Sequence, residues 1–220
     1  MGSNGDKFDD ELIGRMHGFF SNEGALSISK DFEYRPQQQE MAVAVAGALI
    51  HSNPLVVEAG TGVGKSLAYL APAVSFALQQ KRKAVISTHT INLQEQLIDK
   101  DLPLLAKLLE VGFSAVLMKG RANYLCPNRL RRVMVDADDL FESGDKDELD
   151  LIDEWAEQTS DGSLSDLGFE PSNHVWDQVC SERHVCTPKS CGHDSGCFYQ
   201  QVRRDVAEAD VVVLNHTLLF

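Results

Sequence analysis

Residues 55–66, LVVEAGTGVGKS, hold the residue types and spacing with the clearest chemistry in the chain. Glycines at alternate positions lack Cβ atoms, so the backbone N–H groups of this segment can wrap closely around a phosphate chain. Lys65 reaches the β- and γ-phosphates of a nucleotide, and the Ser66 hydroxyl is suited to bind Mg²⁺. We therefore predict a nucleotide-binding loop for ATP in which Lys65 and Ser66 carry the catalytic roles. The predicted loop comprises Ala59, Gly60, Thr61, Gly62, Val63, Gly64, Lys65 and Ser66.

One loop position departs from the strict pattern, because Ala59 stands where the pattern has glycine. A glycine-rich turn that binds no ligand is the alternative interpretation of the segment. The apolar run before the loop and the helical pattern over 65–80 after it favour the nucleotide site. The dipole of that helix would place partial positive charge at the phosphates.

Four cysteines have a spacing that could hold a metal group. Cys186, Cys191 and Cys197 form a C-x4-C-x5-C pattern, and Cys126 lies upstream of them. A [4Fe–4S] cluster takes four thiolates, whereas zinc sites usually show C-x2-C pairs, which this chain lacks. Spacing alone favours the cluster but leaves a zinc ion, or no metal, as alternatives. The cysteine pattern fits an intracellular metal site better than a disulfide framework.

The segment around Cys126, KGRANYLCPNRLRR, is basic and contains no acidic residue. Basic side chains such as Arg121 offset phosphate charge, and a ring such as that of Tyr124 offers a stacking surface for an unpaired base. We predict that Arg121 and Tyr124 contact DNA. The alternative is that these side chains balance the acidic segment that follows or pack around the metal group.

The elements that must position these residues alternate between strands and helices, which predicts an α/β fold with a parallel sheet. Loops at the carboxyl ends of parallel strands meet at one edge of the sheet. The nucleotide loop, Thr88-His89-Thr90 and Asn215-His216 all fall at that edge. The predicted strands are 54–58, 84–87, 115–118 and 210–214, and the predicted helices are 8–20, 36–50 (with 41–50 buried), 65–80 and 92–109.

About 90 residues between the third and last predicted strands interrupt this alternation. A crossover in a parallel sheet is normally far shorter, so we predict an inserted subdomain over 119–205. Its segment 136–170 contains 14 acidic residues and one basic residue. Leu149, Ile152 and Trp155 are spaced three apart, which predicts an amphipathic helix with a solvated acidic face.

The acidic segment accounts for the whole formal charge of −13, so the rest of the chain is neutral and nucleic-acid binding is not excluded. No signal peptide is visible, and the longest apolar run, 41–50, is too short to cross a bilayer. We therefore expect a cytoplasmic protein with no membrane partner, acting as a monomer.

Six motifs occur along the chain: YRPQQQEMA, EAGTGVGKS, ISTHTINLQEQL, KGRANYLCP, the C-x4-C-x5-CF pattern and ADVVVLNHTLLF. Their combination and order resemble the amino-terminal part of the bacterial DinG/YoaA helicases, which are superfamily 2 iron–sulfur helicases related to XPD. The resemblance covers nearly the whole chain and is weakest over 136–175.

The resemblance implies a RecA-like P-loop NTPase sheet, incomplete here, with an inserted, mainly helical iron–sulfur subdomain. Residues 1–118 would be the first part of motor domain 1, 119–205 the inserted subdomain and 206–220 the return strand. The implied activity is ATP-dependent 5′→3′ helicase movement on single-stranded DNA, in DNA repair or replication.

The resemblance also implies residue roles. Arg35 and Gln38 would recognise adenine. The cluster ligands would be Cys126, Cys186, Cys191 and Cys197, which leaves Cys180 as the spare thiol. The DNA-contacting and coupling residues would be Thr88, His89, Thr90 and Gln94.

One family feature is missing from the sequence. An Asp-Glu-Ala-His box, which holds Mg²⁺ and positions the attacking water, is expected shortly after Asn215-His216, but the sequence ends at Phe220. Phosphoryl transfer needs these groups, so we expect these 220 residues alone to bind ATP weakly and to hydrolyse it negligibly. The alternative function is a non-catalytic nucleotide- and DNA-binding iron–sulfur module.

Overall fold

The computed structural model describes residues 3–29, 33–186, 191 and 196–219. The chain divides into two compact units, which are described separately. Unit 1 contains residues 1–117 and 208–216, and unit 2 contains residues 118–207 and 217–220.

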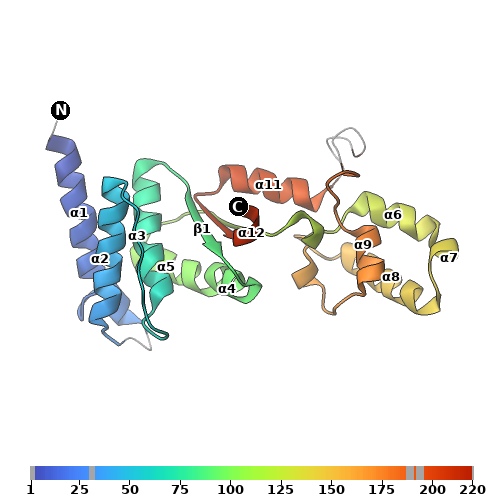
Figure 1. Ribbon diagram of the computed structural model, residues 1–220, viewed down its shortest axis with the longest axis horizontal. Coiled ribbons are helices and arrows are strands. Elements are labelled where there is room, and N and C mark those ends of the chain that lie inside the picture. The colour runs from blue at the N-terminus through green and yellow to red at the C-terminus, as the bar shows by residue number, and fades with distance from the viewer. Residues whose placement is uncertain (1–2, 30–32, 187–190, 192–195, 220) are drawn as a thin grey trace. The chain divides into compact units, whose positions relative to one another are not determined.

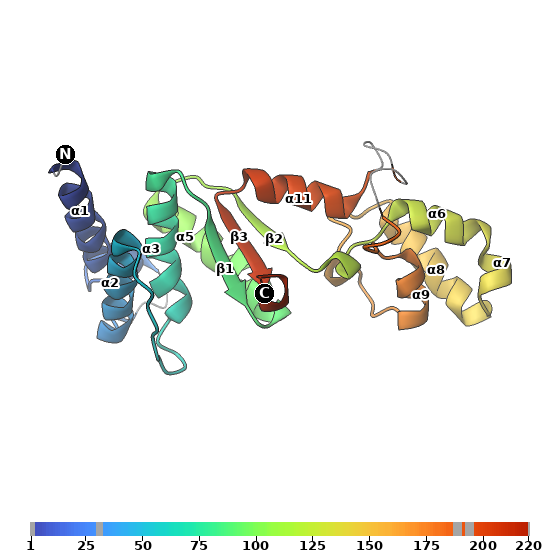
Figure 2. The ribbon, with the colours of Figure 1, turned by 45° about the horizontal axis from the view of Figure 1, so that its top comes forward.

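Unit 1 is a mixed α/β unit with a three-stranded sheet. The strands lie in the spatial order β1 (Ala84–Thr88), β3 (Val211–Asn215) and β2 (Ala115–Met118), which confirms three of the predicted strands. Strands β1 and β3 run parallel, with Ala84 opposite Val211 and Thr88 opposite Asn215 (Figure 2). The last strand in the sequence therefore lies in the middle of the sheet.

In the described part of unit 1, five α-helices accompany the sheet. Helices α2 and α3 lie side by side, and α1 packs against α2 (Figure 1). Helix α2 begins at Pro36, whose fixed φ and missing N–H suit the first helical position. The helix bounds are α1 (Ser3–Phe19), α2 (Pro36–His51), α3 (Lys65–Gln80), α4 (Ile91–Gln96) and α5 (Leu102–Leu109), with a 3-10 turn at Ala25–Ile28.

The predicted helix over 92–109 forms as three joined pieces. A π-helical turn, η2 (Leu97–Asp101), connects α4 to α5. Pro103 lies in the first turn of α5, where its missing N–H leaves an upstream carbonyl without the usual partner. The π-helical turn accommodates that interruption.

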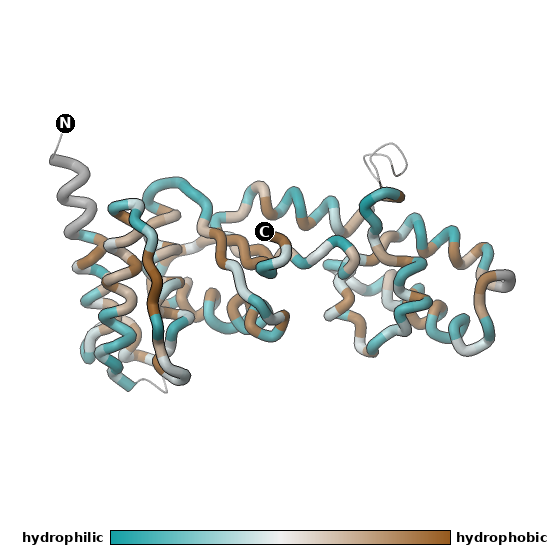
Figure 3. Tube along the Cα trace, viewed as in Figure 1, coloured by the Kyte–Doolittle hydropathy of each residue, from teal (hydrophilic) through white to brown (hydrophobic). Residues whose placement is uncertain are grey.

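The strand predicted at 54–58 is wrong, because the structure shows no strand there. The segment is extended, and Val56 is 96% exposed. A strand needs a neighbour for its backbone N–H and C=O groups, and no strand of the described sheet pairs with this segment. Leu55 and Val57 instead line a cavity of about 590 Å³ together with residues of α2. The hydrophobic link between α2 and α3 is visible in Figure 3.

The burial predicted for the second half of α2 is also only partly correct. Of residues 41–50, Ala42 and Ala46 are buried, and the larger side chains are half-buried. Met41, Val45 and Leu49 line the same open cavity as Leu55 and Val57, so these side chains stay partly exposed. The main core of unit 1 lies among α1, α3, α5 and the sheet, and its members include Leu12, Met16, Leu70, Leu105 and Val213.

Unit 2 is mainly helical and has its own hydrophobic core. Backbone bridges between Leu125 and Cys180 and between Tyr124 and Ser163 tie its distant segments together. Its helices are α6 (Pro127–Val135), α7 (Ala137–Leu140), α8 (Ser143–Ala156), α9 (Asn173–Val179) and α11 (Phe198–Glu208), with 3-10 turns at Arg121–Asn123 and Leu164–Asp166.

The acidic segment forms the predicted amphipathic helix as α8. Leu149 and Ile152 are fully buried in the core of unit 2. The indole N–H of Trp155 donates to Asp166, 3.2 Å away. The four-residue helix α12 (His216–Leu219) follows β3. Among the described residues, none of the helices combines the length and hydrophobicity that a bilayer span requires.

Candidate nucleotide-binding site and neighbouring groups

The predicted nucleotide loop has the backbone of a phosphate-binding turn. Gly62 and Gly64 have φ angles of +83° and +79°, a region that residues with a Cβ rarely adopt. Gly64 also caps α3, so the loop ends at the amino terminus of a 16-residue helix. The first N–H groups of that helix lack intrahelical partners and attract anions. The loop therefore combines flexible backbone donors with the positive end of a helix dipole.

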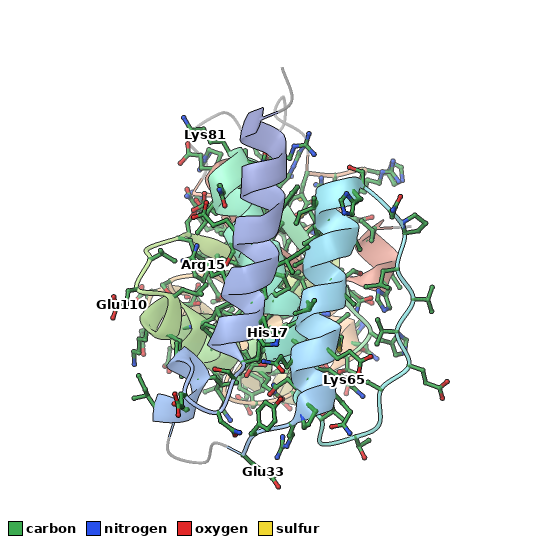
Figure 4. The ribbon with its side chains drawn as sticks, turned by 90° about the vertical axis from the view of Figure 1, so that its left-hand side faces the viewer. Arg15, His17, Glu33, Lys65, Lys81 and Glu110 are labelled. Atoms are coloured by element: carbon green, nitrogen blue, oxygen red, sulfur yellow. The ribbon has the colours of Figure 1, made fainter. Side chains whose placement is uncertain are left out.

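Lys65 folds back onto this loop. Its Nζ donates to the carbonyl oxygens of Ala59 and Gly60, at 2.9 and 3.1 Å. The side chain is exposed and lies at the same end of unit 1 as Glu33 (Figure 4). The ammonium group is thus held over the loop, where it can exchange carbonyl oxygens for phosphate oxygens.

Gln38 braces the loop from α2. It is 5% exposed, and its Nε2 donates to the carbonyl oxygen of Gly64 at 2.8 Å. A Cβ at Gly64 would collide with this amide. Arg35, at the amino-terminal cap of α2, forms an ion pair with Glu33 at 2.9 Å. The two residues predicted to recognise adenine thus lie at the start of α2, and Gln38 contacts the loop directly.

A cavity of about 450 Å³ lies next to the loop. It is lined by Ala59, Gly60 and Val63 of the loop and by Gln37 and Met41 of α2. Three of the eight predicted loop residues therefore line this hollow in unit 1. Ser66 lies at the first turn of α3 and hydrogen-bonds to Tyr69. Burial raises the pKa of Tyr69 above its ordinary value, while this hydrogen bond acts in the opposite direction.

The segment Thr88-His89-Thr90 lies where β1 ends and α4 begins. Thr88 is buried, and its hydroxyl donates to the carbonyl oxygen of Thr90 at 3.2 Å. The Thr90 hydroxyl caps α4 by accepting the N–H of Leu93 at 3.4 Å. His89 and Thr90 are exposed, so they are the two members of this segment that a DNA strand could contact.

Gln94 has a different environment from the one expected for a DNA contact. It is 1% exposed, and its Nε2 has no hydrogen-bond partner among the described residues. An orphaned buried amide costs about 1–3 kcal/mol. In this structure Gln94 is a buried polar group of α4 and is not available at the surface.

The basic segment of unit 2 is largely used for internal contacts. Lys119 is buried and donates to the hydroxyls of Ser163 and Ser165. Arg129 donates to the carbonyl oxygens of Cys180 and Asp177, both at 2.7 Å. For these two side chains the structure favours the alternative in which the basic residues make contacts inside unit 2.

The ring of Tyr124 also lies in the interior. It is 2% exposed, and its hydroxyl accepts the N–H of Lys119 at 3.0 Å. Burial raises the pKa of Tyr124 to about 12, so its hydroxyl stays neutral. The prediction that Tyr124 presents a stacking face is therefore corrected, because no ring face is left exposed.

Tyr199 of α11 is the aromatic residue that accompanies Arg121. The Arg121 guanidinium lies 4.2 Å from the centre of the Tyr199 ring, a cation–π contact. The ring is half-buried and sits 5.8 Å from that of Tyr124. The sequence also predicts a second basic and aromatic patch directly after Cys197 as a candidate DNA contact, and Tyr199 belongs to it. The members of that patch are Phe198, Tyr199, Arg203 and Arg204.

Two of the predicted metal ligands meet in unit 2. The Sγ atoms of Cys126 and Cys186 are 3.7 Å apart, although the residues are distant in sequence. Burial raises the pKa of Cys126 to about 11. Burial acts in the same direction on Cys186, but hydrogen bonds, among them the N–H of Glu182 at 3.3 Å, lower its pKa overall. Cys191 and Cys197 are partly exposed.

These contacts define a thiol pair and not a complete four-ligand site. Within the part of the chain that the structure describes, no three metal-binding side chains come together. The structure describes Cys191 and Cys197, but not residues 187–190 and 192–195 beside them.

Comparisons with known proteins confirm the resemblance. Residues 35–134 match the DEAD/DEAH box helicase family. The chain is 40% identical to the ATP-dependent DNA helicase YoaA of Escherichia coli over 90% of this chain and 31% of that protein. It is 39% identical to the ATP-dependent helicase DinG of Mycobacterium tuberculosis over 84% of this chain and 30% of that protein.

A protein with a different name is also similar. The 3′-5′ exonuclease DinG of Bacillus subtilis is 30% identical over 90% of this chain and 21% of that protein. The chain thus spans about a third or less of the curated relatives it matches. The shared part alone does not distinguish the activities that these names describe.

Proposed function

We propose that this chain is the nucleotide-binding first part of an ATP-dependent 5′→3′ DNA helicase of the DinG/YoaA type. In this proposal unit 1 belongs to a RecA-like motor domain, and the intact protein acts as a monomer and moves on single-stranded DNA. The observation that carries the proposal is the loop over 59–66, where two glycines with positive φ lead into the amino terminus of α3. The similarity to proteins named ATP-dependent DNA helicases supports the choice of reaction.

Lys65 and the backbone of α3 would bind the triphosphate. The Lys65 ammonium exchanges its two loop carbonyl contacts for β- and γ-phosphate oxygens, which are stronger, charged acceptors. Bound Mg²⁺, with Ser66 as a ligand, would neutralise phosphate charge. Gln38 holds the carbonyl of Gly64 in place, so the N–H groups of the following turn stay directed at the ligand.

Adenine recognition by Arg35 and Gln38 is part of the proposal. The two residues are at the start of α2, and the Arg35 side chain is partly exposed. Because the Gln38 Nε2 is already bonded to Gly64, its remaining capacity for adenine is the carbonyl oxygen and the second amide hydrogen.

The nucleotide site is tested by replacing Lys65. We expect Lys65→Ala to weaken binding of a fluorescent ATP analogue with Mg²⁺ by about 10- to 100-fold, because a charge-assisted contact is lost. Titration followed by fluorescence anisotropy measures the affinity. Lys107→Ala is the matched control, because Lys107 is an exposed lysine on α5. Equal affinities for the wild type and Lys65→Ala would contradict the site.

We further propose that unit 2 holds a [4Fe–4S] cluster through Cys126, Cys186, Cys191 and Cys197. The support is the 3.7 Å approach of Cys126 and Cys186, together with the sequence spacing of the other two. The described geometry accounts for two ligands only, so the cluster is assigned no step in the reaction.

Anaerobic purification separates the cluster from the alternatives. We expect the wild type to contain iron and sulfide and to absorb visible light, and Cys126→Ser to lose both signals. Cys180→Ser is the matched control, because Cys180 is a buried cysteine of the same unit that the proposal leaves without a metal. Zinc without iron in the wild type would rule out the cluster.

A further inference from the structure

Two histidines that are far apart in the sequence meet at one edge of the sheet in unit 1. His89 follows β1, and His216 follows β3, which pairs with β1. Both residues are exposed. Their ring centres are 6.2 Å apart, and the ring planes are inclined by 28°. The two imidazoles thus form a pair of nearly parallel flat surfaces at the carboxyl ends of adjacent strands.

Side-chain hydrogen bonds hold the ring of His216 and the backbone of His89. The Nδ1 of His216 lies 2.6 Å from the hydroxyl oxygen of Ser87 on β1. Asn215 donates from its Nδ2 to the carbonyl oxygen of His89 at 3.0 Å. Ordering that is already present in the free protein does not have to be supplied when a ligand binds. The His216 ring and the His89 backbone are therefore ordered by contacts between the ends of β1 and β3.

An open cavity of about 440 Å³ lies beside the ring pair. His89 and His216 line it together with the ring of Tyr69 and the side chains of Ser87 and Thr88. Among the described residues that line the cavity, none is a lysine or an arginine. The remaining lining residues are the aliphatic Val85, Ile86 and Leu93, so the cavity offers aromatic and apolar surface and no lysine or arginine charge. That composition suits a planar, uncharged group better than a phosphate.

We propose that His216 contacts the DNA strand directly and forms, with His89, a stacking platform for one unpaired nucleobase. This inference rests on the proposed function and adds a residue to its DNA-binding edge. Nucleobases stack on aromatic rings whatever their sequence, because every base has a π-face. His216 is thus a base-contacting residue, and Asn215 is a positioning residue.

Two substitutions at one position separate stacking from positioning. His216→Phe keeps a flat ring but removes the bond to Ser87. His216→Asn removes the ring but keeps a polar atom close to the place of Nδ1. We expect His216→Asn to weaken binding of a fluorescein-labelled oligothymidine by about tenfold and His216→Phe to stay within about twofold of the wild type. Fluorescence anisotropy measures both affinities.

The controls address folding and unrelated effects. His51→Asn changes an exposed histidine at the end of α2 and should leave the affinity unchanged. Circular dichroism melts verify that each variant is folded. A fluorescent aminopurine base in the oligonucleotide gives a second readout, because stacking on a ring quenches its emission. Quenching should persist in His216→Phe and disappear in His216→Asn.

The outcomes separate this inference from the proposed function. If the wild type does not bind the oligonucleotide, both are overturned. If the wild type binds and His216→Asn binds equally well, only the role of His216 is overturned. If His216→Phe loses affinity and His216→Asn keeps it, His216 acts through Ser87 and the stacking platform is rejected.

Discussion

The nucleotide loop and the paired ends of β1 and β3 are built in opposite ways. The loop is a continuous stretch whose conformation depends on glycines at 62 and 64 and on the helix that follows. The strand ends join residues about 130 positions apart, and His216 meets Ser87 across the two strands. The loop needs few distant contacts for its shape, whereas the strand ends have no common structure without the sheet.

The supporting strands differ in the same way. The segment that enters the nucleotide loop is extended and exposed, whereas β3 is buried in the centre of the sheet. A glycine-rich loop can therefore keep its backbone conformation beside a segment that lacks a strand partner. Local glycine geometry thus specifies the loop, whereas strand pairing specifies the site where β1 and β3 end.

The largest expected effect on stability distinguishes the buried strand β3 from the exposed apolar segment 54–58. Val213→Thr places a hydroxyl in the fully buried centre of β3 and should lower the free energy of unfolding by about 1–3 kcal/mol. Val56→Thr makes the same change on the exposed segment and should alter it by less than about 0.5 kcal/mol. Denaturant unfolding followed by circular dichroism measures both.

An internal control is present in the chain, because both tryptophans, Trp155 and Trp176, belong to unit 2. Their fluorescence transition should not move in either variant. A loss of stability for Val56→Thr as large as that for Val213→Thr would mean that residues 54–58 form a buried strand in solution.

The next effect concerns the loop itself. Gly64→Ala imposes a positive φ on a residue with a Cβ and directs that Cβ at the Gln38 amide. We expect a loss of about 1–2 kcal/mol in the free energy of unfolding, together with weaker nucleotide binding. Gly60→Ala is the stability control, since Gly60 has no positive φ and open space around its Cβ position. Equal stability of the two variants would show that the loop is not held in this conformation.

The smallest expected effect concerns the contact between the strand ends. Asn215→Ala removes the hydrogen bond to the carbonyl oxygen of His89 and should lower the free energy of unfolding by about 1 kcal/mol. Oligothymidine affinity should fall by a few-fold, because the His89 segment is less ordered. Asn53→Ala, an exposed asparagine after α2, provides the comparison. An unchanged DNA affinity would show that Asn215 does not position this edge.

Much of the local structure was predictable from the residues in sequence. Helix α3 has the predicted bounds, α2 begins at Pro36, and three of four strands form close to the predicted positions. The fourth predicted strand, 54–58, does not form, because an apolar run of this length becomes a strand only when a neighbouring strand pairs with its backbone groups. Periodicity also identified the buried positions Leu149 and Ile152 of α8.

The candidate site was predictable only in part. Gly62 and Gly64 of the loop have the positive φ angles that a phosphate-binding turn uses, whereas Gln94 and Tyr124, both predicted to contact DNA, are buried. A residue type indicates which chemistry is possible, whereas burial decides whether a ligand can reach it. Tyr199 beside Arg121 and the approach of Cys126 to Cys186 depend on how unit 2 folds back on itself.

The sequence by itself determined the glycine-rich loop over 59–66, the helix that follows it and the acidic amphipathic helix. These features depend on glycine, proline and hydrophobic periodicity over short distances. Only the tertiary structure decided that β3 lies between β1 and β2 and that His216 therefore meets His89 and Ser87. The physical reason is that strand order depends on contacts between distant segments, and no local pattern records which strand will become the neighbour.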